Sequence, residues 1–356
     1  MKLGLISFQN SGKTTLYKSL TSSSESVYKP GKQRLNSDSS LITVSDERID
    51  ELTQLYQPKK TSYATIELIN FPGFTESVSS SINGWGKTLQ QMRSVNGFAL
   101  VLRNFVDLAG NLPTPEKDLE KIEAEMILCD HVSIEKRFEK FAWFRQRGKM
   151  TMELQREEKI LKRASDHLDR FEPIRTMPLS PEEEKMIRGF QFLSQKPIML
   201  ILNSDEDNFG TNEVLLSKLS KRYNIVEFAG KFELELSQLE DQNDIQLFMD
   251  EIGITQSGRI RLTRLAYKTL GMISFFTVGA DEVRAWSLKR GDSALDAARA
   301  IHADLGRGFI KAHCFSYHDL IHLRSEKKIK EMGLYKLEGK TYTVQDGTII
   351  DIKFNV

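Results

Sequence analysis

The sequence predicts an α/β domain with a mostly parallel sheet, an inserted α-helical hairpin, and a small α+β domain at its C-terminal end. Three observations predict this order. An apolar run leads through a Gly-Lys-Thr turn into a helical pattern at the start of the chain. From Glu116 the sequence is densely charged with apolar residues three and four apart, and from Gly271 short strand patterns flank one main helix. We therefore expect the α/β domain at 1–115 and 194–270, the insertion at 116–193 and the last domain at 271–356.

Length and composition are those of an ordinary globular protein. The 356 residues exceed what one hydrophobic core usually supports. A formal net charge of +1 gives no basic field over the whole chain, so any RNA contact would need a local patch. No apolar run approaches the length needed to cross a bilayer. Cys129 and Cys314 lie far apart without CxxC spacing, so a reducing cytoplasm is expected. We also expect a monomer with no membrane partner.

The segment 4–16 has the pattern of a strand, a phosphate-binding loop and a helix. In such a loop the backbone N–H groups point at a polyphosphate, the lysine reaches the terminal phosphates, and the hydroxyl after it can hold Mg²⁺. Ser7 stands where the motif usually begins with glycine, so only its second half matches. The expected phosphate contacts, with Thr14 also the Mg²⁺ ligand, are Asn10, Ser11, Gly12, Lys13, Thr14 and Thr15.

Two later stretches occupy the positions of mobile switches. The Ser-rich stretch 22–40 is explained equally well as a connector. A strand pattern at 63–70 ends in Asn70-Phe71-Pro72-Gly73, where phosphate-loop enzymes place Asp-x-x-Gly, and 75–86 follows as the second switch. Asn70 can bind a metal-bound water but carries no charge. A weakened Mg²⁺ site is therefore expected.

Buried strand patterns at 98–102 and 198–202 continue the sheet. The second ends in Asn203-Ser204-Asp205-Glu206, where a nucleotide-binding sheet places its base-reading loop. A short strand at 226–229 is expected to run into a loop beside the base. The expected base contacts are Asn203, Glu206, Ala229 and Gly230.

The charged region predicts an antiparallel coiled-coil hairpin, although solvated helix faces explain the charge itself. One apolar seam begins at Leu119 and the other at Met150, with Gly148 between them. In the last region, strands are expected at 283–288, 309–315, 340–344 and 348–354, and a helix at 293–305 capped by Ser293. This order is that of a β-grasp domain.

These parts, in this order, resemble the YchF type of Obg-related GTPases, usually described as Obg-like ATPases. The resemblance covers nearly the whole chain and is carried by several motifs: Asp46-Glu47-Arg48, Arg103-x-Phe105, Val283-Arg-Ala-Trp286, Ala300-Ile301-His302-Ala303-Asp304, Val344-Gln-Asp-Gly347 and Phe354-Asn355-Val356. It implies a P-loop NTPase domain interrupted by a coiled-coil arm, a ubiquitin-like TGS domain, and association with the ribosome or RNA. It also implies Mg²⁺ with ATP or GTP, and a preference for ATP because Asn203-x-x-Glu206 replaces Asn-Lys-x-Asp.

The sequence departs from the family where its chemistry is expected. Ser7 and Asn70 replace the loop glycine and the switch aspartate, and Arg34 falls where the switch threonine is expected. Phe74 fits the family's hydrophobic residue in place of a water-positioning glutamine. The family also relies on a histidine after the Arg-x-Phe strand, yet no histidine precedes His131. Two hypotheses follow: a nucleotide-binding, ribosome-linked regulator with weak or absent hydrolysis, or a nucleotide-independent scaffold that binds a protein or RNA through the arm and the TGS domain.

Overall fold

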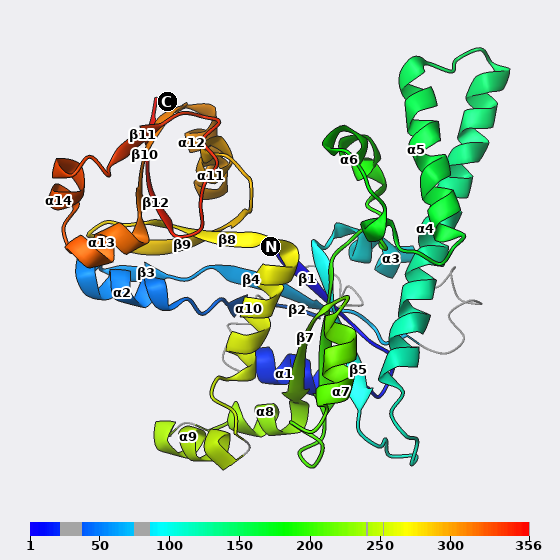
Figure 1. Ribbon diagram of the computed structural model, residues 1–356, viewed down its shortest axis with the longest axis horizontal. Helices are drawn as coiled ribbons and strands as arrows, with labels where there is room; N and C mark the ends of the chain where they lie inside the picture. The colour runs from blue at the N-terminus through cyan, green and yellow to red at the C-terminus, as the bar shows by residue number, and fades with distance from the viewer. Residues whose placement is uncertain (22–37, 75–85, 240, 252, 356) are drawn as a thin grey trace, which may run out of the picture. The chain divides into compact units, whose positions relative to one another are not determined.

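The computed structural model describes residues 1–21, 38–74, 86–239, 241–251 and 253–355 (Figure 1). Arg34 and most of both expected switch stretches lie outside these residues. The chain forms two compact units: an α/β unit of Lys2–Ser40 and Leu68–Thr255, and a C-terminal unit of Met1, Leu41–Glu67 and Gln256–Val356. No described helix is long and apolar enough to cross a membrane.

The α/β unit is built on a six-stranded sheet of order β2-β4-β1-β5-β6-β7. Its strands are β1 (Lys2–Ile6), β2 (Asp38–Thr43), β4 (Thr65–Asn70), β5 (Gly97–Asn104), β6 (Ile198–Ser204) and β7 (Asn224–Ala229). Strands β1, β5, β6 and β7 pair in parallel. Every residue of β6 is buried, as in a parallel sheet covered on both faces. The carboxyl ends of these strands share one edge, which brings the loops that follow them together.

Helices cover this sheet and supply its core. They are α1 (Lys13–Thr21), α3 (Gly86–Ser94), α7 (Glu213–Ser220) and α8 (Gly230–Leu236). Helix α9 (Gln242–Glu251) packs with α8 in a separate cluster that includes Phe232 and Met249. Helices α1 and α8 pack against each other. The main cluster of buried side chains joins β1, β5 and β6 to Met92 of α3. The mostly parallel α/β fold that the sequence predicts is confirmed.

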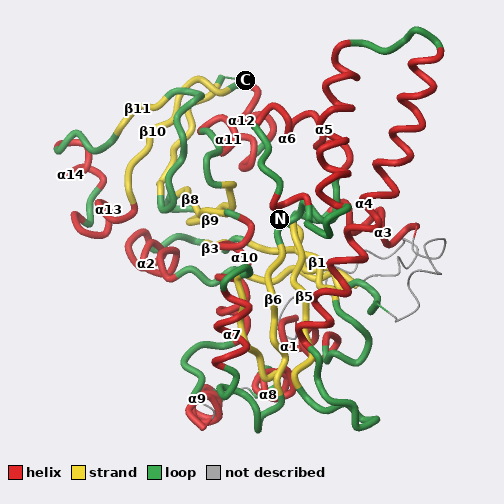
Figure 2. The backbone as a smooth tube through the Cα atoms, turned by 45° about the vertical axis from the view of Figure 1, so that its right-hand side comes forward, coloured by secondary structure: helices red, strands yellow, loops and turns green. Residues whose placement is uncertain are grey.

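Two long helices, α4 (Pro115–Gln146) and α5 (Met152–Leu168), lie side by side in Figures 1 and 2. The first half of α4 packs on the sheet, because Leu119, Ile122 and Met126 belong to the main cluster. The second half packs with α5 in a separate cluster that includes Phe141 and Leu161. Short helical segments follow: η2 (Ile174–Thr176), α6 (Pro181–Ile187) and η3 (Arg188–Phe190). Helix α4 is thus continuous from the sheet to the end of the hairpin.

The C-terminal unit contains a second six-stranded sheet of order β11-β10-β12-β8-β9-β3. Its strands are β3 (Lys60–Ser62), β8 (Met272–Thr277), β9 (Glu282–Lys289), β10 (Phe309–Ser316), β11 (Lys336–Glu338) and β12 (Thr348–Phe354). Its helices are α2 (Glu47–Tyr56), α10 (Gly258–Leu270), α11 (Ala294–Ile301), α12 (Ala303–Arg307), α13 (Tyr317–Leu323) and α14 (Glu326–Glu331). Strand β3 pairs with β9, and Arg48 of α2 forms an ion pair of 3.0 Å with Asp346. Sequence from the N-terminal part of the chain therefore completes this unit.

Two expectations for this unit differ from the structure. Residues 340–344 form no strand, because β12 already lies between β10 and β8, and only the bridge between Ser293 and Thr343 remains. The helix expected at 293–305 is divided into α11 and α12 by His302, whose extended backbone places its ring to accept the Asp304 N–H at 3.2 Å. The Ser293 cap is confirmed, since Ser293 and Asp296 form a reciprocal capping box.

Candidate functional site

The loop between β1 and α1 has an alternating backbone. Asn10 and Gly12 adopt left-handed conformations, with φ of 61° and 77°, on either side of Ser11. Such alternation turns successive N–H groups into a concave, anion-binding surface. Ser7 is fully buried, and its backbone φ is not in the left-handed region that favours glycine. Its Oγ donates to the Phe8 carbonyl at 2.7 Å. Its replacement of the motif's first glycine is therefore compatible with the loop.

Asn203 joins this loop to the residue that follows β7, at the carboxyl ends of the parallel strands. Its Nδ2 donates to the Ser11 carbonyl at 2.8 Å, and its Oδ1 accepts the Gly230 N–H at 3.0 Å. A Cβ at Gly12 would lie 2.2 Å from Asn203 Nδ2, and one at Gly230 would lie 2.6 Å from Oδ1. Both positions need glycine because the Asn203 amide fills the space between them. The structure shows that Asn203 connects the phosphate loop to Gly230, and the contact of both residues with the base stays a prediction.

Lys13 begins α1 with its side chain buried beneath the loop. Its Nζ donates to the Phe71 carbonyl, in the segment that follows β4. Burial lowers the pKa of Lys13 to about 8. A buried ammonium that holds a single carbonyl gains much from a nearby phosphate, because opposite charges attract strongly where water is excluded. Thr14 is exposed in the same turn of helix, and Thr15 is half-buried.

The residues expected to hold Mg²⁺ supply neutral oxygens. The buried Oδ1 of Asn70 and the buried Oγ of Ser11 have no hydrogen-bond partner in the protein, which is unusual for buried polar atoms and leaves both able to accept a hydrogen bond from a bound group. Within the described residues no group of three or more His, Cys, Asp or Glu could hold a metal. Mg²⁺ readily takes most of its ligands from water and phosphate oxygens. Thr14 and Asn70 fit an ion held mainly by the phosphates of a nucleotide.

The segment after β6 differs in part from expectation. Glu206 is exposed, with a carboxylate oxygen 3.9 Å from Lys231 Nζ. Asp205 accepts the Asn208 N–H at 3.0 Å, so its carboxylate is used within its own turn. Beyond β7 the expected loop is absent, because buried Ala229 leads directly into α8. The structure brings Ala229 and Gly230 to the same edge as Asn203 without an intervening loop.

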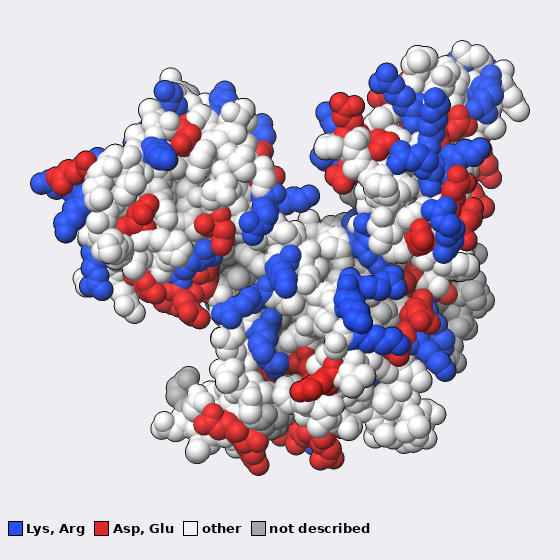
Figure 3. All heavy atoms as spheres, viewed as in Figure 1, with Lys and Arg blue, Asp and Glu red and all other residues white. Residues whose placement is uncertain are grey.

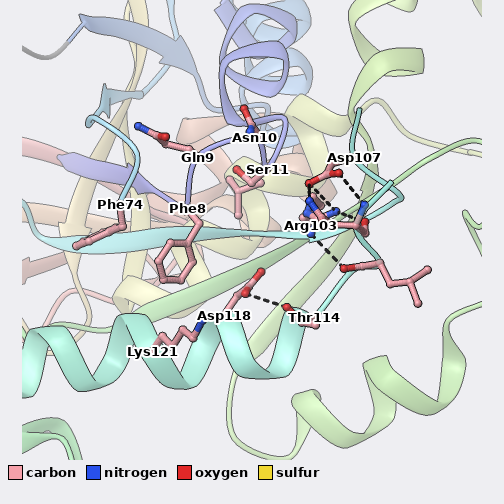
Figure 4. A pocket seen from close by; sticks show the side chains of 13 residues that line it. Phe8, Gln9, Asn10, Ser11, Phe74, Arg103, Asp107, Thr114, Asp118 and Lys121 are labelled. Atoms are coloured by element: carbon pink, nitrogen blue, oxygen red, sulfur yellow. Dashed lines mark hydrogen bonds and ion pairs between the residues drawn. The ribbon is translucent and has the colours of Figure 1, made fainter. Parts of the chain in front are cut away.

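A polar pocket of about 530 Å³ opens beside the phosphate loop (Figure 4). The first loop residues and Phe74 line it together with the segment after β5 and the start of α4. The guanidinium of Arg103 donates to the carbonyls of Asn111 at 2.8 Å and Leu112 at 3.2 Å, which fixes that segment. Arg103 also lies 3.7 Å from Asp107.

Sequence reasoning missed several residues of this edge. It gave no role to Asp107 or to Lys121, which lies 5.9 Å from the Phe8 ring centroid. It also missed Glu227 in β7, although a carboxylate inside an apolar strand pattern is a signal that a buried polar contact exists. The Phe71 carbonyl could not be found, because a backbone contact leaves no trace in residue type.

Comparison with known proteins agrees with this architecture. The family model YchF-GTPase_C, described as "Protein of unknown function (DUF933)", matches residues 272–355. The ribosome-binding ATPase YchF of Buchnera aphidicola subsp. Schizaphis graminum is 34% identical over 364 residues, covering 100% of this chain and 99% of its own. The Bacillus subtilis protein of the same name is 31% identical over 366 residues, covering 99% of each. The solved YchF GTPase of Schizosaccharomyces pombe superposes with a TM-score of 0.82 at 24% identity, covering 99% of this chain and 97% of that one. Full-length similarity at this level means that the chain belongs to the YchF family.

Proposed function

We propose that this protein binds ATP or GTP with Mg²⁺ at the loop 10–15 and acts as a ribosome-linked regulator with weak or absent hydrolysis. The observation that carries the proposal is the buried Lys13 ammonium directly after a loop in which Asn10 and Gly12 have left-handed backbones. A scaffold without nucleotide would not need this lysine, whose burial has a free-energy cost. The nucleotide-independent alternative is therefore not favoured.

The base contacts point to adenine or to indifference between the bases. Asp205 is occupied by the Asn208 N–H, and Glu206 is exposed beside Lys231. Because each carboxylate already has a partner in the protein, we propose that neither reads the N1–H and N2–H₂ of guanine. We expect competition titration to show ATP binding at least as tightly as GTP. A tenfold preference for GTP would contradict this assignment.

The link to the ribosome rests on relatives in Buchnera aphidicola and Bacillus subtilis, which are named ribosome-binding ATPases. We assign that contact to the helical arm, residues 116–193, and to a TGS-like domain at 271–356, with the protein in the cytoplasm as a monomer. On the face shown in Figure 3, basic and acidic side chains alternate over α4 and α5. Contact through the arm would therefore depend on specific side chains rather than on a uniform positive field.

Co-sedimentation with purified bacterial ribosomes, with and without ATP, tests this function. The expected result is ribosome binding whose extent changes with ATP in the wild type and is unaffected by ATP in Lys13→Ala. Lys18→Ala, an exposed lysine on the same helix, should respond like the wild type. Ribosome binding that ignores ATP in all three proteins would contradict the proposed regulation.

A further inference from the structure

A second polar cluster lies at the carboxyl ends of β5, β6 and β7. Successive residues of a strand point to opposite faces, so Ser204 projects away from the face on which Asn203 braces the phosphate loop. Ser204, Asn104 and Glu227 are all buried, with exposed fractions of 3%, 8% and 9%. Nothing in the site described above uses these three side chains.

The Glu227 carboxylate is the centre of the cluster. Its Oε1 accepts the Ser204 hydroxyl at 2.6 Å and Asn212 Nδ2 at 2.6 Å. Its Oε2 accepts the Gly210 N–H at 3.2 Å. The Ser204 hydroxyl in turn accepts Asn104 Nδ2 at 2.9 Å. Both carboxylate oxygens are therefore held by donors from β6 and from the segment 205–212.

Those donors include both ends of one loop. Ser204 is the last residue of β6, whereas Gly210 and Asn212 come just before α7, so Glu227 fixes the start and the finish of the segment 205–212. Between these points lie Asp205 and Glu206, which follow Asn203 by two and three positions. A carboxylate that accepts several hydrogen bonds can offset its own burial and order the groups that donate to it.

We propose that Glu227 is a positioning residue for the nucleotide base. It holds the loop 205–212 in register with Asn203, so that the base is bound at a fixed place relative to the phosphate loop. This inference rests on the proposed nucleotide-binding function. Glu227 acts through the loop, and the phosphates are held separately by Lys13 and the loop 10–15.

The test compares Glu227→Gln with Glu213→Gln, which removes an exposed carboxylate from the first turn of α7. Glutamine has the same shape as glutamate, but an NH₂ group replaces one of the two carboxylate oxygens. That NH₂ group cannot accept a hydrogen bond from Gly210 or Asn212. ATP, GTP and inorganic tripolyphosphate are titrated into each protein with Mg²⁺. Tripolyphosphate has no base, so it reports on the phosphate loop alone.

We expect Glu227→Gln to bind ATP about tenfold more weakly, as for the loss of one hydrogen bond to a charged group. Its affinity for tripolyphosphate should equal that of the wild type, and Glu213→Gln should match the wild type for every ligand. Asn212→Ala removes one donor from the loop side and should weaken ATP in the same direction, which keeps the test available if Glu227→Gln fails to fold.

Two results with Glu227→Gln would overturn the inference. ATP affinity that is unchanged in Glu227→Gln would mean that the cluster does not position the base. An equal loss for ATP and tripolyphosphate would mean that the effect reaches the phosphate loop or the whole fold. If the wild-type protein binds tripolyphosphate and binds ATP no more tightly, the base adds no affinity. The base site is then absent, and the inference fails while the proposed phosphate contact stands. If it binds neither, the proposed function fails as well.

Discussion

Lys13 shows how one buried charge can make a site dependent on pH. In the folded protein without a ligand, burial lowers its pKa to about 8 from an ordinary value of 10.5. The ammonium is therefore present at pH 7 but is mostly lost at pH 9. A nucleotide phosphate favours the charged form, so binding above pH 8 must be accompanied by proton uptake.

We expect the affinity for ATP to fall about tenfold between pH 7.5 and pH 9, because about nine-tenths of Lys13 is neutral at the higher pH. The ATP phosphates are already ionised over this range, so the change reports on the protein. Lys13→Arg should show no such fall, whatever its absolute affinity, because a guanidinium stays charged. A wild-type affinity that is equal at both pH values would contradict the combination of a lowered pKa and a phosphate contact at Lys13.

Asp130 of α4 is a second buried ionisable group, and its contacts are structural rather than part of the candidate site. It accepts the N–H groups of Leu193 at 2.9 Å and Ser194 at 2.7 Å, with Arg93 4.0 Å away. Burial is the largest effect and raises the pKa of Asp130 to about 6 from 3.8. The folded protein thus binds this proton more tightly than the unfolded chain. The resulting stability is fully present below pH 4 and is lost as the pH rises through 6.

Asp130→Asn removes this titration. The unfolding free energy of the wild type, measured relative to the variant in urea, should fall by about 2 kcal/mol between pH 4.5 and pH 7.5. Other titrating groups cancel in the difference, because both proteins contain them. A difference that stays constant or grows with pH would show that Asp130 is ionised without cost.

At the residue scale, the sequence predicts some site residues and hides others for a physical reason. Lys13, Thr14 and Asn203 follow from local spacing after a strand, and the structure places them at one edge of the sheet. Glu227 and Asp130 act through partners that are far away in the chain or that are backbone atoms. Such contacts depend on the fold, and residue types alone do not encode them.

The phosphate loop is the element whose shape depends most on a single residue. Gly12 has φ of 77°, and its missing Cβ leaves room for the Asn203 amide. An added methyl group would both strain the backbone and displace Asn203 from the Ser11 carbonyl. The loop would then lose its connection to β6.

Gly12→Ala should therefore reduce ATP affinity at least a hundredfold and destabilise the fold by about 1–3 kcal/mol. Gly189→Ala is the matched control, because Gly189 lies outside the left-handed region and no atom lies within 4 Å of an added Cβ. Titration and thermal unfolding of both variants give the comparison. Normal ATP binding by Gly12→Ala would mean that the loop does not need the observed conformation.

Among whole elements, the strands of the parallel sheet were the easiest to predict, since each is a short apolar run bounded by polar residues. The divided helix at His302 and the missing strand at 340–344 were not predicted. Their sequences are compatible with helix and strand, but the His302 side-chain cap divides the helix, and β10 and β8 already pair with both sides of β12. Pairing between strands is a property of the sheet and not of any one segment.

For the whole molecule, the sequence predicted the order of its parts better than their connections. Residues 41–67 were expected to belong to the α/β domain, yet they share a compact unit with the C-terminal sequence. Pairing of Lys60 with Glu282 and the contact of Arg48 with Asp346 join segments that are far apart in the chain. No local pattern shows such pairing.

The rate of nucleotide hydrolysis depends on several parts of the chain acting together. Hydrolysis requires Mg²⁺ held across the β and γ phosphates, a positioned water and donors to the developing charge. Asn70 is uncharged where a metal-binding aspartate is expected, and no histidine occurs in the segment 106–115 beside the pocket. We expect single-turnover hydrolysis of ATP at or below about 10⁻⁴ s⁻¹. Turnover near 1 s⁻¹ that disappears in Lys13→Ala would contradict this and make Arg34 the first residue to test.

The central claim is that a nucleotide is bound above Lys13, and calorimetric titration of ATP with Mg²⁺ tests it most directly. Wild type and Lys18→Ala should bind with equal affinity, because Lys18 is exposed on the far part of α1. Lys13→Ala should remain folded and lose at least a hundredfold in affinity, about 2.7 kcal/mol. Equal binding of ATP by Lys13→Ala and the wild type, or no binding by the wild type, would contradict the account.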